Sequence, residues 1–304
     1  MKNSPSKEIA TLALVAAGII GGLMPIISKI ILRELPPLTV LFLSVSIMLS
    51  VLLPIVRRDV PQIWLHRKNL LKFGFLWLTN IALFIIGLNF TTAIASGVLY
   101  AGVPLLVFAL YYFVSREKIE VSQAAGVLVG FIGMVLFLIG SLQGAADFGS
   151  FTGNIIIFIA TVAWATYLAY SKQLGQSIRH LILNTGSAII AWVGSGILML
   201  VLEGFTGLVK LQTLSLGGWV SLVYIALFVR VAMIFLFNWG IKYGSPIVAG
   251  SMVYISLLTT GALTTIILGE QITTRFVLGA ILVLAGVFLT STLPLLQNRK
   301  ASTA

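Results

Sequence analysis

The sequence predicts an all-α integral membrane protein with ten transmembrane helices, arranged as two inverted five-helix repeats with both termini in the cytoplasm. Three observations lead to this fold class. First, the 304 residues are 59% hydrophobic and only 9% charged, whereas soluble domains carry about 25% charged residues. Second, the apolar residues form blocks close to the roughly 20 residues that a helix needs to cross a bilayer. Third, the second half of the chain repeats features of the first.

Glycines, prolines and charge clusters divide the chain into ten predicted spans. In chain order these are residues 8–31, 37–56, 72–90, 93–114, 121–140, 152–171, 181–202, 217–240, 246–268 and 274–294. Each is bounded by helix-breaking or charged residues, such as Arg33-Glu34-Leu35-Pro36-Pro37 after the first span. No small-residue cleavage site follows the first apolar block, so we interpret it as a span and not as a removable signal peptide.

The distribution of Lys and Arg predicts the orientation. Of the nineteen basic residues, fourteen fall in segments on the side of the N-terminus, three fall on the opposite side, and Lys29 and Arg230 lie within spans. Cytoplasmic loops carry the excess of Lys and Arg, so both termini are predicted to be cytoplasmic and the protein to be a multi-pass protein of the inner (cell) membrane. The net charge of +11 therefore needs no nucleic acid partner.

An internal repeat supports the inverted arrangement. The segment SREKIEVSQAAGVLVGFIGMVLFL begins at Ser115, LGEQITTRFVLGAILVLAGVFLTS begins at Leu268, and a shift of 153 residues superposes Glu117 on Glu270, Gly126 on Gly279 and Gly133 on Gly286. Because glycine is frequent, chance coincidence is the alternative, but the matches share their position relative to a span boundary. Five spans per repeat invert the second copy, which is typical of secondary transporters. We place the repeats at residues 1–148 and 149–304.

Two longer segments carry a family resemblance: NFTTAIASGVLYAGVPLLVFALYYFVSREKI and NWGIKYGSPIVAGSMVYISLLTTGALTTIILGEQI. With them the chain resembles the ten-helix, EamA-type branch of the drug/metabolite transporter superfamily over about residues 8–295. The resemblance implies alternating access around a cavity lined by the first, third, fourth, sixth, eighth and ninth spans. Family substrates include amino acids, sugar phosphates, nucleotide sugars and drugs. The family's proline is present as Pro104 but is Leu257 in the second copy, so a symmetric kink is not expected.

Arg230 is the main candidate binding residue, because it stands near the middle of the eighth span within YIALFVRVAMIF. An arginine at the bilayer centre costs from about +2.5 to more than about +10 kcal/mol. No span interior supplies a carboxylate, since all eight acids lie at or beyond span ends. One interpretation is structural, with the guanidinium pinning a helix through backbone carbonyls. The other, which we favour, is a fixed cation in a water-filled cavity that binds carboxylate or phosphate.

Aromatic and amide residues deep in other spans could complete a substrate site. These candidates are Trp77, Asn80, Tyr100, Trp164, Tyr167 and Tyr254, together with Lys29 of the first span. For any one ring, packing is the simpler interpretation. As a set, they suit an apolar pocket with a few polar groups. Lys29 either extends to the interface or reaches the cavity beside Pro25.

The sequence also argues against other chemistry. Glu117 and Glu270 border spans, where capping a helix end is favoured over a proton relay. His66 and His180 are expected in loops without metal-ligand spacing, and there are no cysteines. We therefore expect no enzyme activity, no metal and no cofactor. The expected partners are a small-molecule substrate and the lipid bilayer, with the chain a monomer or a weak dimer.

The predicted function is a secondary transporter, an exporter of an amino acid or related carboxylate-bearing metabolite, with Arg230 contacting the anionic group. A sugar-phosphate or nucleotide-sugar exchanger is the second hypothesis, since such substrates call for more than one cation and only Lys29 could join Arg230. An amine or drug exporter would need a buried carboxylate to attract its substrate. A membrane scaffold is the non-transport alternative, and it would not need an internal charge. Without an intramembrane acid, facilitated diffusion or exchange is favoured over proton coupling.

Overall fold

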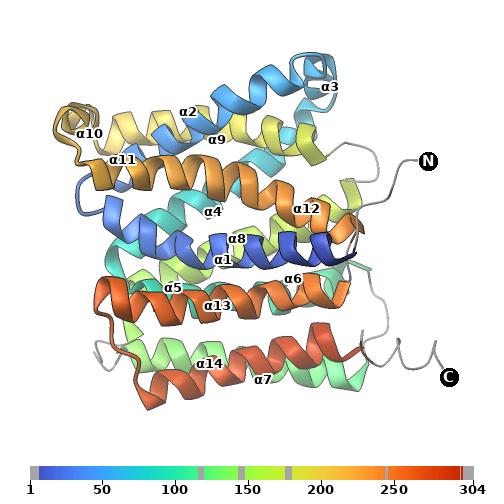
Figure 1. Ribbon diagram of the computed structural model, residues 1–304. Coiled ribbons are helices and arrows are strands. Elements are labelled where there is room, and N and C mark those ends of the chain that lie inside the picture. The colour runs from blue at the N-terminus through green and yellow to red at the C-terminus, as the bar shows by residue number, and fades with distance from the viewer. Residues whose placement is uncertain are drawn as a thin grey trace.

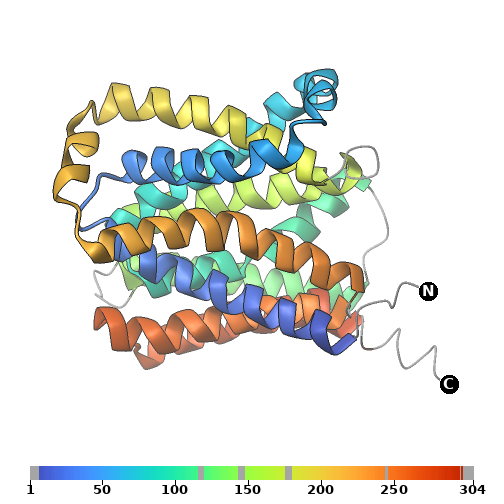
Figure 2. The same cartoon turned by 45° about the horizontal axis from the view of Figure 1, so that its top comes forward.

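In the computed structural model, residues 7–115, 120–142, 148–174, 180–243, 246–294 and 296 are described, and their regular structure is entirely helical. Long helices lie side by side in a bundle (Figures 1 and 2). The helical elements that make up these long helices are, in chain order, α1 (Lys7–Ile31), α2 (Pro37–Val56), α4 (Arg67–Phe90), α5 (Ala93–Ala101), α6 (Val103–Ser115), α7 (Val121–Leu142), α8 (Phe151–Leu174), α9 (His180–Leu202), α11 (Leu216–Val223), the π-helical η3 (Tyr224–Ala232), α12 (Met233–Tyr243), α13 (Pro246–Leu268), α14 (Thr274–Val287) and the π-helical η4 (Phe288–Thr292).

Among the described residues, eight helical segments are long and apolar enough to cross a membrane, and two shorter ones cover Met252–Leu268 and Phe276–Thr292. Two of the eight join consecutive elements, namely α5 with α6 and α11 with η3 and α12. The order of the ten segments agrees with the predicted spans. The chain is therefore an all-helical membrane protein, while the cytoplasmic location of the termini and the boundary between the repeats stay predictions.

The structure differs from the prediction mainly at span ends. The third span begins at Arg67 and not at residue 72, and His180, expected in a loop, is the first residue of α9. Short helices that the hydropathy pattern did not indicate lie between spans: α3 (Val60–Leu65), α10 (Thr206–Val209) and the 3₁₀ turn η2 (Lys210–Thr213). Helices of four to six residues are too short to register as apolar blocks.

The two predicted copies also differ around the family's proline. The first copy is interrupted at Gly102, which separates α5 from α6, and Pro104 is the second residue of α6. The second copy, α13, continues without a break past Leu257. Proline lacks the N–H that continues a helix ladder and fits only its first turn, so the break precedes Pro104 and has no counterpart at Leu257.

Two apolar clusters fill the bundle. One joins α2, α4 and α9 and includes Leu41, Met48 and Trp77. The other joins α5, α7, α13 and α14 and includes Leu99 and Phe137. Helices α4 and α8 contribute to both clusters, so they form the centre of the molecule. Many large apolar side chains point outward, as expected where lipid replaces water as the surrounding solvent.

Glutamates fix helix ends at one end of the bundle, away from where α1 begins. The carboxylates of Glu34, Glu203 and Glu270 each accept hydrogen bonds from backbone N–H groups at the start of a helix in the other predicted repeat. The donors are Ser215 N for Glu34 (2.8 Å), Leu38 N and Thr39 N for Glu203 (2.7 and 2.8 Å), and Ala93 N and Ile94 N for Glu270 (2.8 and 3.1 Å). A carboxylate at a helix N-terminus satisfies orphan donors and complements the helix dipole. The predicted capping role of Glu270 is confirmed, and Glu117 lies outside the described residues.

Candidate functional site

Arg230 lies at the centre of the longest composite span. It stands fourteen residues after Leu216 and thirteen before Tyr243, inside the π-helical segment η3. Isolated π-helical turns interrupt α-helices rarely and occur often at functional sites. The Arg230 side chain is only 8% exposed. The predicted mid-span position therefore holds, and in this conformation the side chain is covered.

In the part of the chain that the structure describes, two contacts hold the guanidinium. Its Nε donates a hydrogen bond to Ser44 Oγ of α2 at 3.0 Å. The Ser44 hydroxyl in turn donates to the carbonyl oxygen of Leu41 at 2.9 Å. The guanidinium carbon lies 5.8 Å from the ring centroid of Trp77 on α4, within cation–π range. The side chain is thus oriented by a hydroxyl and an aromatic face.

These contacts leave most of the binding capacity of Arg230 unused. A guanidinium has five N–H donors, and Nε is the one that bonds another residue in the described part of the chain. A desolvated cation–π contact is worth roughly 2 kcal/mol and a hydrogen bond to a charged group about 1.5–3 kcal/mol. Together they offset the lower estimate for a central arginine but not the upper one, above about 10 kcal/mol. The remaining donors suit an anion or water.

The Arg230–Trp77 contact also joins equivalent positions of the two predicted repeats. The two residues are 153 positions apart, the same shift that superposes Glu117 on Glu270. The ends of their helices, Phe90 of α4 and Tyr243 of α12, have the same separation. Equivalent positions of two inverted copies approach each other near the axis that relates them. Binding sites of inverted-repeat transporters lie at such an interface near mid-membrane.

Predicted aromatic residues of α8 pack in the same apolar cluster as Trp77. The rings of Trp164 and Tyr167 are stacked, with centroids 5.1 Å apart, and Phe73 meets Tyr167 edge-on at 5.5 Å. The Tyr167 hydroxyl donates to Asn184 Oδ1 at 3.1 Å. This part of the site is a wall of rings whose polar tip already has a partner.

Asn80 and Tyr100 form a second polar pair, one helical turn from Trp77 along α4. Asn80 Nδ2 donates to the carbonyl oxygen of Ala160 at 2.9 Å and to the hydroxyl of Tyr100. Tyr100 also meets Phe84 edge-on, with ring centroids 4.9 Å apart. Both amide protons of Asn80 are therefore used within the protein, and its side-chain oxygen remains as an acceptor.

The last two predicted residues lie elsewhere. Tyr254 packs against the second apolar cluster, with its hydroxyl 3.5 Å from Thr292 Oγ1. Lys29 is in the last turn of α1 and lines a pocket near the helix ends. The structure thus brings Arg230 and Trp77 into direct contact, places Trp164 and Tyr167 in their cluster and Asn80 with Tyr100 beside it, and separates Lys29 from them.

Sequence reasoning missed Ser44, Phe73 and Asn184, which orient the predicted residues. A usable signal existed for Ser44, because a hydroxyl in the middle of an apolar span is buried and must find a partner. No signal linked it to Arg230, which is 186 positions away. Phe73 and Asn184 resemble any other ring or amide in a membrane helix, so the sequence did not distinguish them.

Comparisons with known proteins support the transporter prediction. Residues 8–139 and 151–292 each match the EamA-like transporter family. The "Uncharacterized transporter YetK" of Bacillus subtilis is 26% identical over 92% of this chain and 86% of its own length. The "Probable amino-acid metabolite efflux pump" of Salmonella typhimurium is 26% identical, over 93% of this chain and 95% of its own length.

Two further similarities concern location and fold. The "Uncharacterized inner membrane transporter YedA" of Escherichia coli is 25% identical over 86% of this chain and 83% of its own length. One solved crystal structure superposes with a TM-score of 0.64 at 17% identity, covering 95% of this chain and 98% of that one. At that identity the likeness concerns the fold alone.

Proposed function

Since the chain belongs to the EamA-like transporter family, we propose that it exports an amino acid or a related carboxylate-bearing metabolite by alternating access. Arg230 binds the carboxylate, and the rings of Trp77, Trp164 and Tyr167 enclose the rest of the solute. The chain is a multi-pass membrane protein and a transporter, not an enzyme. The proposal adds the class of substrate and the direction of transport.

The observation that carries the proposal is the state of Arg230. Within the described residues, this permanent cation stands mid-span with one hydrogen bond to a serine hydroxyl and one aromatic contact. Its planar fork is suited to bidentate binding of a carboxylate. Binding would supply the counter-charge that the described protein residues do not provide. In this conformation Arg230 is covered, and alternating access exposes it to the solute in another conformation.

The position of Lys29 favours a substrate with a single anionic group at Arg230. Phosphorylated sugars carry two negative charges or more and are usually held by several cations. Lys29, the other intramembrane cation, lines a separate pocket near the helix ends. One cation among aromatic side chains matches a carboxylate on a small, partly apolar solute. A cationic drug would be repelled by the same charge.

The name of the Salmonella typhimurium relative, an amino-acid metabolite efflux pump, points to the same substrate class. At 26% identity, that name guides the choice of test substrates only. The first panel should therefore contain amino acids, with sugar phosphates and organic amines as the competing classes.

Counterflow in proteoliposomes tests the proposal. Vesicles preloaded with each unlabelled solute should accumulate the labelled form through wild-type protein if it is a substrate. Arg230→Met keeps the volume and removes the charge, and should weaken amino-acid uptake about 10- to 100-fold, as expected for losing a hydrogen-bonded charge pair. Arg230→Lys should retain part of the uptake, because it keeps the charge and loses the planar fork.

The matched control is Lys210→Gln, which also removes one positive charge but from an exposed position in η2, and should transport normally. A hydrophobic residue of similar volume often replaces a buried charge without loss of stability, so Arg230→Met should remain folded on gel filtration. Normal amino-acid counterflow by Arg230→Met would show that the arginine is structural. Accumulation of amines, with none of amino acids, would refute the proposed substrate class.

A further inference from the structure

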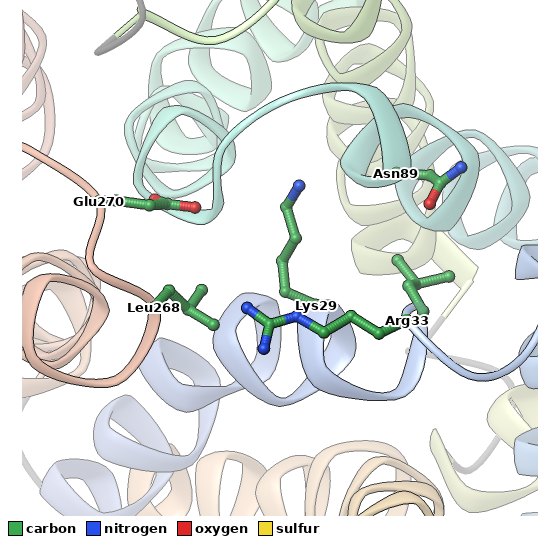
Figure 3. A pocket seen from close by; sticks show the side chains of 6 residues that line it. Lys29, Arg33, Asn89, Leu268 and Glu270 are labelled. Atoms are coloured by element: carbon green, nitrogen blue, oxygen red, sulfur yellow. The ribbon is translucent and has the colours of Figure 1, made fainter.

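A charged pocket lies at the end of the bundle where α13 is followed by α14. It has a volume of about 270 Å³ and is lined by Lys29, Leu32, Arg33, Asn89, Leu268 and Glu270. These residues come from the C-terminal ends of α1, α4 and α13 and from the chain that follows α1 and α13. In Figure 3 the Lys29 ammonium points into the space between Glu270 and Asn89, and the Arg33 guanidinium extends along α1 toward Leu268.

The charges of this pocket do not balance within the described protein. Lys29 and Arg33 contribute two positive charges and Glu270 one negative charge. Both oxygens of Glu270 already accept backbone N–H groups of α5, from Ala93 at 2.8 Å and Ile94 at 3.1 Å. The carboxylate is therefore held as a helix cap, and the residues that line the pocket carry a net charge of one positive unit. A half-buried ammonium beside a guanidinium is stabilised when an anion enters between them.

We propose that this pocket is an anion site, separate from Arg230, that binds the carboxylate of the transported solute at one mouth of the pathway. Lys29 and Arg33 hold the anionic oxygens, and Asn89 adds an amide on the opposite wall. The volume of about 270 Å³ is just below the range of roughly 300–1,000 Å³ for drug-sized sites, which suits a solute of amino-acid size. The identity of the solute rests on the proposed function, whereas the anion site rests on the pocket itself.

The position of the pocket gives it a distinct role. Lys29 is in the last turn of α1, whereas Arg230 is mid-span. A net positive charge at a pathway mouth raises the local concentration of an anionic solute at that mouth. Neutralising Lys29 and Arg33 should therefore weaken solute binding from this side of the membrane only. Loss of Arg230 should weaken it from both sides.

Chemical modification of Lys29 tests for the bound anion without relying on transport. The full chain is placed in nanodiscs of neutral phosphatidylcholine and treated with an acetylating reagent, and acetylation of Lys29 and Lys210 is followed by mass spectrometry. Lys210 is an exposed control at the same end of the bundle. Sodium acetate at about 100 mM should slow acetylation of Lys29 relative to Lys210 by roughly fivefold or more, as for a millimolar dissociation constant. Sodium chloride at the same ionic strength should not.

The variant Arg33→Gln separates binding from a general salt effect. Arg33 is exposed, so the variant should fold, and it should lose the acetate protection of Lys29. Equal modification of Lys29 in acetate and chloride, or unchanged protection in Arg33→Gln, would overturn the anion site. Lys29 already protected in phosphatidylglycerol discs without acetate would identify a lipid phosphate as the occupant and overturn the assignment to a solute.

The two proposals fail in different ways. If Arg230→Met transports normally while Lys29 is still protected by acetate, the anion pocket stands and the mid-membrane carboxylate site is wrong. If Lys29 is not protected while Arg230→Met loses transport, the proposed function stands without a charged mouth. If Lys29 is protected by acetate, transport defects of Lys29→Gln from one side only, measured in inside-out and right-side-out vesicles, place the pocket on the pathway.

Discussion

At the scale of single residues, the ionisable side chains fall into two groups. Glu34, Glu203 and Glu270 have fixed partners and hold the ends of helices. Arg230 and Lys29 lie inside spans without a carboxylate bound to them in the described structure, and both proposals rest on them. The hydrogen-bonded glutamates are already satisfied, whereas a cation in a membrane without a directly bound carboxylate remains able to bind an anionic ligand.

Glu34 provides a pH-dependent test of the first group. The hydroxyl and N–H of Ser215 donate to its carboxylate at 2.6 and 2.8 Å and hold the pKa of Glu34 below its usual value of 4.5. A lowered folded-state pKa contributes stability that is present above the ordinary carboxyl pKa and is lost as the pH falls through the folded value. Because Glu34 is only partly buried, solvent screens this interaction, and the effect should be small and sensitive to salt.

The measurement is thermal unfolding in detergent as the pH is lowered from about 5 to about 3, the window that contains the shifted titration. Wild type should lose thermal stability across this window, and Glu34→Gln should lose less of it. Glu8→Gln, which removes a carboxylate from the first turn of α1, serves as the control and should follow wild type. Identical pH profiles for wild type and Glu34→Gln would contradict the cap.

At the scale of elements, close contact between α7 and α14 depends on glycine. A Cβ added at Gly286 would lie 2.6 Å from the carbonyl oxygen of Gly126 and 2.6 Å from the Cα of Gly130. Small residues let membrane helices approach this closely and gain van der Waals contact. Gly126 and Gly286 are members of the repeated glycine pairs seen in the sequence, and the structure shows that the two fifth helices pack on each other through them.

Alanine substitutions at two glycines of α14 test this crossing. Gly286→Ala should destabilise the protein by about 1–3 kcal/mol, because the added methyl group meets backbone atoms that cannot move aside cheaply. Gly279→Ala is the matched control, since a Cβ there would meet only Phe137 at 3.8 Å. Both changes bring the same gain in helix propensity, so their difference in unfolding midpoint reports the contact. Equal midpoints would show that the crossing tolerates a wider separation.

At the scale of the whole molecule, the orientation in the membrane is still a prediction. The Lys and Arg distribution places both termini in the cytoplasm. The hydrogen bonds of Glu34, Glu203 and Glu270 join the two predicted repeats at the end of the bundle away from where α1 begins. With cytoplasmic termini, these caps and the Lys29 pocket face the outside. The proposed charged mouth would then be the outer one.

Single cysteines can determine this orientation, because the chain has no cysteine of its own. Arg58 and Lys210 are both exposed and lie at opposite ends of the predicted spans. In intact cells, a membrane-impermeant maleimide should label Lys210→Cys, and should label Arg58→Cys only after the membrane is opened. The reverse labelling pattern would invert the assignment and make the Lys29 pocket cytoplasmic.

Much of the fold followed from the sequence, because the bilayer requires each span to be a continuous apolar helix of a minimum length. Apolar blocks, helix breakers and the 153-residue shift are all properties of neighbouring or regularly spaced residues. They predicted the ten helices, the mid-span arginine without a local partner and the capping role of Glu270. Helix starts such as Arg67 and the short helices between spans were less well predicted, since polar ends carry a weak hydropathy signal.

The partners of the candidate residues were decided by the tertiary structure alone. Arg230 meets Ser44 across 186 positions, Glu270 caps a helix 177 positions away, and Lys29 shares a pocket with Asn89 and Glu270. Such contacts depend on how helix faces rotate and cross when they pack, and many sequences with the same apolar pattern would pack differently. The sequence determined which charges enter the membrane, and packing determined which of them were left without a counter-charge.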